Sequence, residues 1–120
     1  VAPRADLEVE LKALEITQLR LVSAYDKTRT DGKPDPLSSV LKIKGSELIQ
    51  AASELVMDVG GPLSMPIWAQ ELEQLTNSPA HLPEWTTPST NLYLHLRAAS
   101  IYGGSNEIQK NILAKAVLGL

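Results

Sequence analysis

The chain has 120 residues, of which 43% are hydrophobic and 21% charged, and its formal net charge is −3 at pH 7. This balance is typical of one globular domain, and a mild negative charge without a basic run argues against nucleic acid as a partner. Because cysteine is absent, disulfides and thiolate metal sites are excluded, and two distant histidines, His81 and His95, are too few for a zinc site. We expect no metal and a cytoplasmic location.

The start of the chain reads VAPRAD, which has neither a signal-peptide pattern nor an initiator methionine. No stretch of about 18 uninterrupted apolar residues occurs, so we expect no membrane span. These features are consistent with a trimmed piece of a longer protein. We expect residues 1–120 to form a single helical domain.

The first half of the chain predicts two long helices. The first runs from Asp6 to about Thr28, because apolar residues recur there at helical spacing: Leu7, Leu11, Leu14, Leu21 and Tyr25. After the loop RTDGKPDP, Asp35 is a suitable N-cap and Pro36 a suitable first residue of a second helix, which ends at the tripeptide GGP from Gly60. Its expected buried face carries Leu37, Leu41, Leu48, Ala52, Leu55 and Val59. Two such helices joined by a short loop predict an antiparallel hairpin.

The pattern weakens between Leu63 and Pro88. The stretch PIWAQELEQLT predicts a short helix, and NSPAHLPEWTTP, rich in proline, predicts a loop. Trp68 and Trp85 lie in this region, and two interpretations stay open. Each tryptophan anchors its segment on the helices, or one of them lines a ligand entrance.

The last part of the chain predicts two more helices separated by a glycine pair. One runs from about Ser89 to Tyr102, with Leu92, Leu96 and Ala99 along one side. After Gly103-Gly104, Ser105 is a suitable N-cap for a final helix. The expected apolar face of that helix carries Ile108, Ile112, Ala116 and Leu120. No β-strand alternation occurs, so we expect an all-α antiparallel up-and-down bundle of four to five helices around one hydrophobic core.

The glycine pair at 103–104 allows two interpretations. Such a pair before a capping serine is most often a corner between helices, but it also lets a ligand approach the main chain at a helix N-terminus. A second pair, in MDVGG, ends the second helix. Neither pair matches the phosphate-binding loop with its lysine or the dinucleotide fingerprint after a strand, so a nucleotide site here is of another kind.

The segment RAASIYGGSNEIQKNILAKAVLGL, residues 97–120, closely resembles the C-terminal signature of the acyl-CoA dehydrogenase family, IYxGTxEIQRxxIAxxLLG. The segment ELVMDVGG, residues 54–61, and the first helix are also similar to that family, so the resemblance covers essentially the whole chain. It implies an all-α domain that helps to bind FAD and acyl-CoA and forms the core of a homodimer or homotetramer. It further implies an oxidoreductase of acyl-CoA metabolism, such as fatty acid metabolism.

The resemblance also implies site residues. Gly104, Ser105 and Asn106 match the family's contacts to the FAD nucleotide. Met57, Gly60 and Gly61 match a segment that reaches the FAD of a neighbouring subunit, although Met57 stands where the family usually has a hydrogen-bonding glutamine. Lys115 matches a position that can approach the acyl-CoA.

The catalytic base of the family is a carboxylate, which removes a proton α to the thioester while a hydride leaves the β carbon for the flavin. In many members it follows the motif tyrosine directly. Gly103 occupies that position here and cannot act as a base, so we assign no catalytic residue in this chain. We do not choose Glu107 or Asp58 as the catalytic base instead. Glu107 is expected to be exposed, and Asp58 lies at the end of its helix.

Arg97 has two open interpretations: it pairs with a carboxylate or a helix end, or it fixes the motif turn near the flavin. Family members are about three times longer than this chain and include a helical N-terminal domain and a central β-domain. We therefore interpret the chain as part of the C-terminal domain of such an enzyme, inactive alone. The alternative is a non-catalytic helical scaffold or interaction module descended from that fold.

Overall fold

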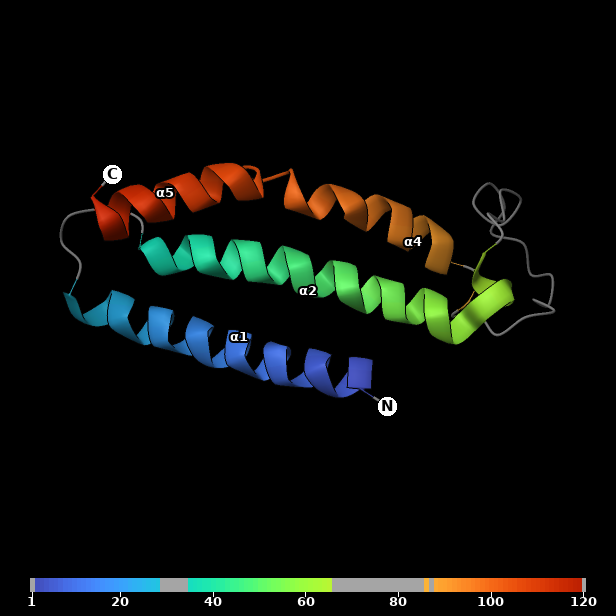
Figure 1. The fold of residues 1–120 in the computed structure, drawn as a ribbon. Coiled ribbons are helices and arrows are strands. Elements are labelled where there is room, and N and C mark those ends of the chain that lie inside the picture. The colour runs from blue at the N-terminus through green and yellow to red at the C-terminus, as the bar shows by residue number, and fades with distance from the viewer. Residues whose placement is uncertain (1, 29–34, 66–85, 87, 120) are drawn as a thin grey trace.

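The computed structural model describes residues 2–28, 35–65, 86 and 88–119, and Figure 1 shows their arrangement. These residues form four α-helices: α1 (Ala2–Thr28), α2 (Pro36–Gly60), α4 (Ser89–Leu96) and α5 (Asn106–Leu118). Two short 3₁₀ helices, η1 (Gly61–Ser64) and η2 (Arg97–Ser100), follow α2 and α4. The described residues contain no strand, which confirms the predicted all-α class. None of the described helices has the length and hydropathy needed to cross a membrane.

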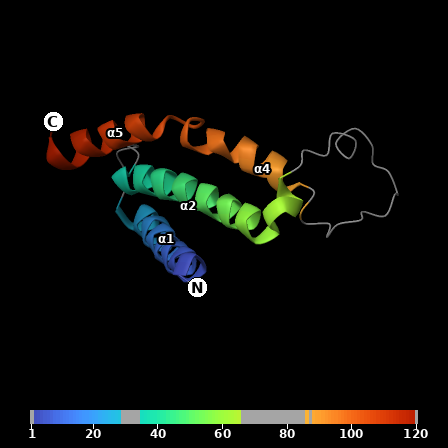
Figure 2. The same cartoon turned by 45° about the vertical axis from the view of Figure 1, so that its right-hand side comes forward.

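Helix α2 is the centre of the fold. It packs against α1 on one side and against α4, η2 and α5 on the other, and Figures 1 and 2 show the same order from two directions. Both α1 and the α4–η2–α5 segment run antiparallel to α2, and α4 and α5 lie end to end. The predicted up-and-down arrangement is therefore confirmed, with α2 as its shared partner.

Local capping rules explain where α2 begins and ends. Asp35 has extended backbone angles, and its Oδ1 accepts a hydrogen bond of 2.9 Å from the N–H of Leu37. Pro36 occupies the first helical position, where its missing N–H leaves no donor unpaired. At the other end Gly61, with a φ of 51°, donates its N–H to the carbonyl of Met57. Both predicted boundaries are confirmed.

The prediction of one continuous helix from Ser89 to Tyr102 is wrong. Helix α4 ends at Leu96, and the chain tightens into η2. The side chain of Gln50 on α2 donates hydrogen bonds of 3.1 Å to the carbonyls of both Leu96 and Arg97. Because these two carbonyls accept hydrogen bonds from a side chain of another helix, they do not need the backbone N–H groups that would continue the α-helix.

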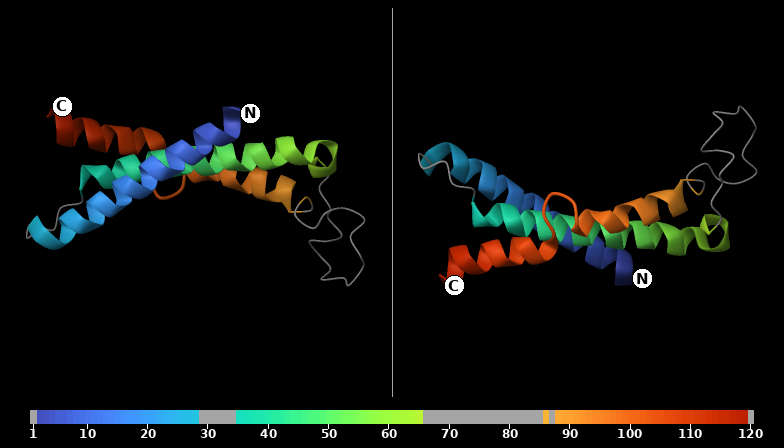
Figure 3. Two further views of the ribbon diagram at one scale, coloured as in Figure 1. Left: turned by 90° about the horizontal axis from the view of Figure 1, so that it is seen from below. Right: turned by 90° about the horizontal axis from the view of Figure 1, so that it is seen from above.

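The predicted apolar face of α2 is only partly buried. Leu41, Leu48 and Leu55 are half-buried, but Leu37 is 38% and Val59 69% exposed, and Ala52 is exposed as well. The two views of Figure 3 show α1 crossing α2 at an angle, so that the helices diverge away from the crossing. Leu37 and Val59 lie near opposite ends of α2.

The hydrophobic core is small in the described part of the chain. Only three apolar residues are buried there: Ile43, Leu96 and Ala99. The other buried side chains are polar and mostly small: Ser39, Ser46, Ser53, Ser64, Thr86, Ser89, Thr90 and Asn106. Three of these serines lie seven residues apart on the face of α2 that meets α4 and α5. This interface is therefore held by hydrogen bonds as much as by apolar contact.

Helices α4 and α5 expose much of their predicted apolar faces. Leu92 is 48%, Ile108 53% and Ile112 42% exposed, and Ala116 is exposed too. Helix α5 turns Asn106 and Gln109 toward α2 instead, because these residues hydrogen-bond to it. Trp68, Trp85, His81, Leu120, the predicted helix and loop around the tryptophans, and the side chain of Tyr25 lie outside the described residues.

Candidate functional site

The glycine turn, residues 103–105, joins η2 to α5. Gly103 has a φ of 68° and Gly104 a φ of 88°, a left-handed conformation that side chains with a Cβ rarely adopt. Both glycines are exposed. The predicted break is confirmed, and it places open main chain beside a helix N-terminus.

Ser105 caps α5 as predicted. Its backbone is extended, with φ −61° and ψ 156°, and its hydroxyl oxygen accepts a 3.4 Å hydrogen bond from the N–H of Ile108. The hydroxyl also hydrogen-bonds the carboxylate of Glu107. The N–H of Glu107 itself and this hydroxyl hold the pKa of Glu107 below its ordinary value. Glu107 is exposed and ionised, and it serves as a local cap of α5.

Asn106, the first residue of α5, turns its side chain away from the surface. The residue is 9% exposed, its Oδ1 accepts a 2.8 Å hydrogen bond from the ammonium of Lys42, and its Nδ2 donates to Ser46 at 3.1 Å. The hydroxyl of Ser46 donates in turn to the carbonyl of Ile43. Both functional atoms of this amide are therefore used to fasten the start of α5 to α2.

Gln109, which the sequence analysis did not select, touches the glycine turn from within. Its Nε2 donates to the carbonyl of Gly103 at 3.3 Å, and its Oε1 accepts a 2.7 Å hydrogen bond from Ser39 on α2. A Cβ at Gly104 would lie 2.9 Å from that same Nε2. No local sequence pattern singles out Gln109, because its partners Ser39 and Gly103 come together only in the folded chain.

Arg97 is fully engaged between α4 and α2. Its Nη2 donates to the carbonyl of Gln50 at 2.8 Å and to Ser53 at 2.7 Å, and its Nε donates to the carbonyl of Tyr93 at 3.2 Å. Its guanidinium lies 4.3 Å from the centre of the Tyr93 ring, and Glu54 is 3.9 Å away. The structure thus places Arg97 among helix carbonyls and a carboxylate. This arrangement agrees with the first of the two interpretations, in which Arg97 pairs with a carboxylate or a helix end.

The second glycine segment lies at the far end of α2. Gly60 is buried, the N–H of Gly61 is bonded to the carbonyl of Met57, and the sulfur of Met57 lies 3.9 Å from the hydroxyl of Thr90, which donates to the carbonyl of Ser64. The first glycine segment is anchored on α2 near Ser46, which bonds to Asn106 at the start of α5. Met57 follows Ser46 by roughly three helical turns, which is about 16 Å along α2. The structure therefore keeps the two glycine segments of one chain well apart.

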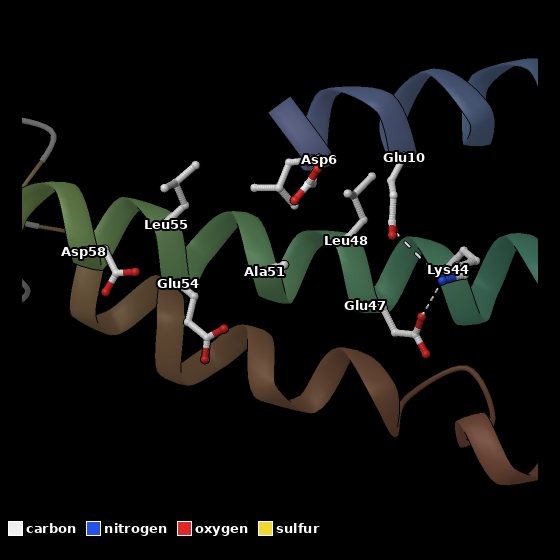
Figure 4. A pocket seen from close by; sticks show the side chains of 10 residues that line it. Asp6, Glu10, Lys44, Glu47, Leu48, Ala51, Glu54, Leu55 and Asp58 are labelled. Atoms are coloured by element: carbon white, nitrogen blue, oxygen red, sulfur yellow. Dashed lines mark ion pairs between the residues drawn. The ribbon is translucent and has the colours of Figure 1, made fainter. Parts of the chain in front are cut away.

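Grooves flank the contact between α1 and α2 on both sides. Figure 4 shows one of about 390 Å³, in which the ammonium of Lys44 lies 3.2 Å from Glu47 and 3.9 Å from Glu10. The hydrogen bond that Lys44 donates to Glu47 and the charges of both carboxylates raise the pKa of Lys44. Asp58 also lines this acidic groove and is exposed. Among the described residues no group of metal-binding side chains gathers in it or elsewhere.

The other groove, of about 510 Å³, is apolar. Its lining comes from Leu7, Glu8, Leu11 and Leu14 of α1 and Gly45, Leu48, Ile49 and Ala52 of α2. Helix periodicity places Ile49 and Glu47 on opposite flanks of α2, so the two grooves open on opposite sides of the helix pair.

The residues of the glycine turn fit a main-chain contact to FAD, the cofactor that the sequence resemblance implies. Nothing lies within 4 Å of a Cβ built on Gly103, so the outer side of the turn is open to a ligand. Gly104 and Ser105 are part of this open turn, whereas the side chain of Asn106 fits only as internal support. In the second segment, the N–H of Gly61 already has a partner within the chain, the carbonyl of Met57.

Comparison with known proteins gives the family. A family profile described as "Acyl-CoA dehydrogenase, C-terminal domain" matches residues 3–118. A curated protein from Mycolicibacterium smegmatis named "Acyl-CoA dehydrogenase IpdE1" is 35% identical over 104 residues, which is 87% of this chain and 23% of that protein. One of the same name from Mycobacterium tuberculosis is 36% identical over 107 residues, which is 87% of this chain and 24% of that protein.

The chain thus spans about a quarter of the length of these curated relatives. No solved structure gives a significant match. The family profile covers nearly all of the chain, and the described fold is the helical one that the sequence predicts. The chain therefore belongs to the family of acyl-CoA dehydrogenase C-terminal domains.

Proposed function

We propose that this chain is part of a FAD-dependent acyl-CoA dehydrogenase, in which it supplies contacts to FAD and surface for subunit packing, and that it is inactive alone. The observation that carries the proposal is the glycine turn. In a chain of this family, two exposed glycines with positive φ precede a capped helix N-terminus. Main chain without a Cβ allows close approach, and a helix N-terminus favours the oxygens of a phosphate or ribose group.

In this proposal the chain binds and orients, while the hydride chemistry comes from the cofactor. When bound, FAD accepts the hydride that leaves the β carbon of an acyl-CoA. Gly104 and Ser105 would hold the cofactor through the main chain and the serine hydroxyl. Asn106 would act by fastening the start of α5 rather than by side-chain contact, because its amide is occupied by Lys42 and Ser46.

The catalytic base is assigned to no residue of this chain. Gly103, at the position after the motif tyrosine, has no side chain. The carboxylate of Glu107 accepts hydrogen bonds from its own N–H and from Ser105, which lower its pKa and with it its strength as a base. Lys115, exposed in the last turn of α5, is kept as a candidate contact to acyl-CoA.

We also propose that the protein is a homo-oligomer. Along α2, Met57 lies about 16 Å and Gly60 about 21 Å from Ser46, where α5 is anchored, and the family resemblance implies that this segment contacts the FAD of a neighbouring subunit. Exposed large apolar residues support packing of this kind, because such surface favours association. On α1 and around α5 they include Val9, Ile16, Leu19, Val22, Ile101, Tyr102, Ile108, Val117 and Leu118. The proposal keeps the cytoplasmic location expected from the sequence.

The test is to express the complete reading frame that contains this chain, purify the product, and record its visible absorption before and after adding acyl-CoAs without oxygen. The panel should vary in chain length and branching. The proposal predicts a yellow protein whose flavin absorption bleaches with at least one acyl-CoA. The 120-residue chain tested beside it should not oxidise any of them.

A colourless product that is folded and takes up no added FAD would contradict the proposal. It would favour the non-catalytic helical module, which the absence of a base at Gly103 also fits.

A further inference from the structure

The side chain of Gln109 connects the glycine turn to α2. Its amide nitrogen faces the carbonyl of Gly103 at 3.3 Å, and its amide oxygen faces the hydroxyl of Ser39 at 2.7 Å. A carbonyl can only accept a hydrogen bond, so the amide nitrogen must point to the turn and the oxygen to α2. The orientation of the amide is therefore fixed by its two partners.

The side chain of Gln109 joins a buried residue of α2 to an exposed turn. Ser39 is 4% exposed and Gln109 is half-buried, whereas Gly103 and Gly104 are exposed. A side chain held at a buried point thus supports main chain that faces outward. Because the carbonyl of Gly103 is drawn toward Gln109, the open side of the turn is the one away from α2.

Gln109 also gives a steric reason for glycine at position 104. A Cβ there would lie 2.9 Å from the amide nitrogen of Gln109, so that any other residue would push this amide away. At Gly103 a Cβ would meet nothing within 4 Å, and only its φ of 68° favours glycine. The two glycines therefore have different constraints, and only the one at 104 depends on Gln109.

The start of α5 is fastened independently through Asn106. Its amide is held by Lys42 and Ser46, one to two turns further along α2 than Ser39. Two amides of α5 thus fix the turn to α2. Asn106 fixes the position of the first turn of α5 on α2, and Gln109 fixes the direction of the carbonyl of Gly103.

We propose that Gln109 is a positioning residue that, supported by Ser39, holds the glycine turn in the conformation that contacts FAD. The inference rests on the proposed function of the turn and assigns to Gln109 a role through the main chain of Gly103, without contact to the cofactor. Asn106, in comparison, positions α5 as a whole.

The test compares two isosteric variants in the product of the complete reading frame. Gln109→Glu keeps the acceptor for Ser39 but removes the donor to Gly103, so that a carboxylate faces a carbonyl. Gln50→Glu is the matched control. It makes the same change in the same α2 interface and removes the donors to Leu96 and Arg97, but it does not touch the turn. Both variants are checked by circular dichroism and thermal unfolding.

The first readout needs no cofactor. In flavin-free protein, amide hydrogen exchange is measured for a peptide covering 102–110, which includes the bonded N–H groups of Ile108 and Gln109. The second readout is the FAD dissociation constant from flavin fluorescence. We expect faster exchange and about five- to tenfold weaker FAD binding in Gln109→Glu, and neither change in Gln50→Glu.

Unchanged exchange in Gln109→Glu would overturn the inference, because the turn would then not depend on this contact. Faster exchange with unaltered FAD affinity would overturn it as well, because a loosened turn would then be irrelevant to the cofactor. If the wild type binds no FAD, the proposed function fails, and the exchange result still decides whether Gln109 holds the turn.

Discussion

The ammonium of Lys42 on α2 lies 2.8 Å from the amide oxygen of Asn106, the first residue of α5. This contact joins two positions that are far apart in the chain at the start of the helix that follows the glycine turn. It is one of a series of polar contacts, from Ser39 to Ser53, that attach α4, η2 and α5 to α2. The first prediction tests how much this contact contributes to the free energy of unfolding.

Replacing Asn106 by alanine should lower the free energy of unfolding by about 1–3 kcal/mol, because a buried amide loses its bonds to Lys42 and Ser46. Urea-induced unfolding followed by circular dichroism measures the change. Asn111→Ala on the exposed side of the same helix is the control and should stay within about 0.5 kcal/mol of wild type. Equal stability of the two variants would show that the buried amide contributes nothing.

Arg97→Lys should destabilise the chain by about 1–3 kcal/mol despite keeping the charge. Lysine cannot reach the carbonyl of Gln50 and the hydroxyl of Ser53 with one planar group while stacking on Tyr93. The control is Arg20→Lys on the exposed face of α1, which should have little effect. Thermal unfolding of both variants separates the roles, and a wild-type midpoint for Arg97→Lys would contradict this account.

Alanine should be costlier at Gly104 than at Gly103. Both residues have positive φ, so each variant pays about 1–2 kcal/mol of backbone strain. Only at Gly104 does the new Cβ also displace the amide of Gln109. The difference in unfolding free energy between the two variants measures this displacement. It should shrink in a Gln109→Ala background, and a difference that persists there would have another cause.

Glu107 should stabilise the fold in a pH-dependent way. Its folded-state pKa is held below the ordinary value of 4.5 by its own N–H and the hydroxyl of Ser105. Stability from a depressed carboxyl pKa is present above the unfolded value and is lost as the pH falls through the folded one. Wild type should therefore exceed Glu107→Gln in thermal midpoint at neutral pH, and the difference should shrink as the pH falls below 4.5 and disappear once the pH is below the folded-state pKa. A pH-independent difference would contradict the pairing.

The sequence predicted those parts of the fold that depend on local rules. The cap at Asp35, the stop at Gly60 and the cap at Ser105 each follow from a few neighbouring residues, and all three are confirmed. The glycine turn was found in the same way, because a glycine pair interrupts a helical pattern.

The helix interfaces do not follow from local rules or from apolar periodicity. The face of α2 toward α4 and α5 is marked instead by polar residues, the serines at 39, 46 and 53, which are spaced seven residues apart. The break after Leu96 depends on Gln50, which is distant in sequence. Gln109 was missed because its two partners, Ser39 and Gly103, meet only in the folded chain.

The central claim, that the glycine turn holds the flavin, is tested most directly by FAD affinity. Wild type, Gly104→Ala and Gly119→Ala are compared in the product of the complete reading frame by flavin fluorescence titration. Gly119 also has positive φ, 72°, but lies at the other end of α5. The account predicts at least tenfold weaker FAD binding for Gly104→Ala and wild-type binding for Gly119→Ala. Wild-type affinity in a folded Gly104→Ala variant would contradict it.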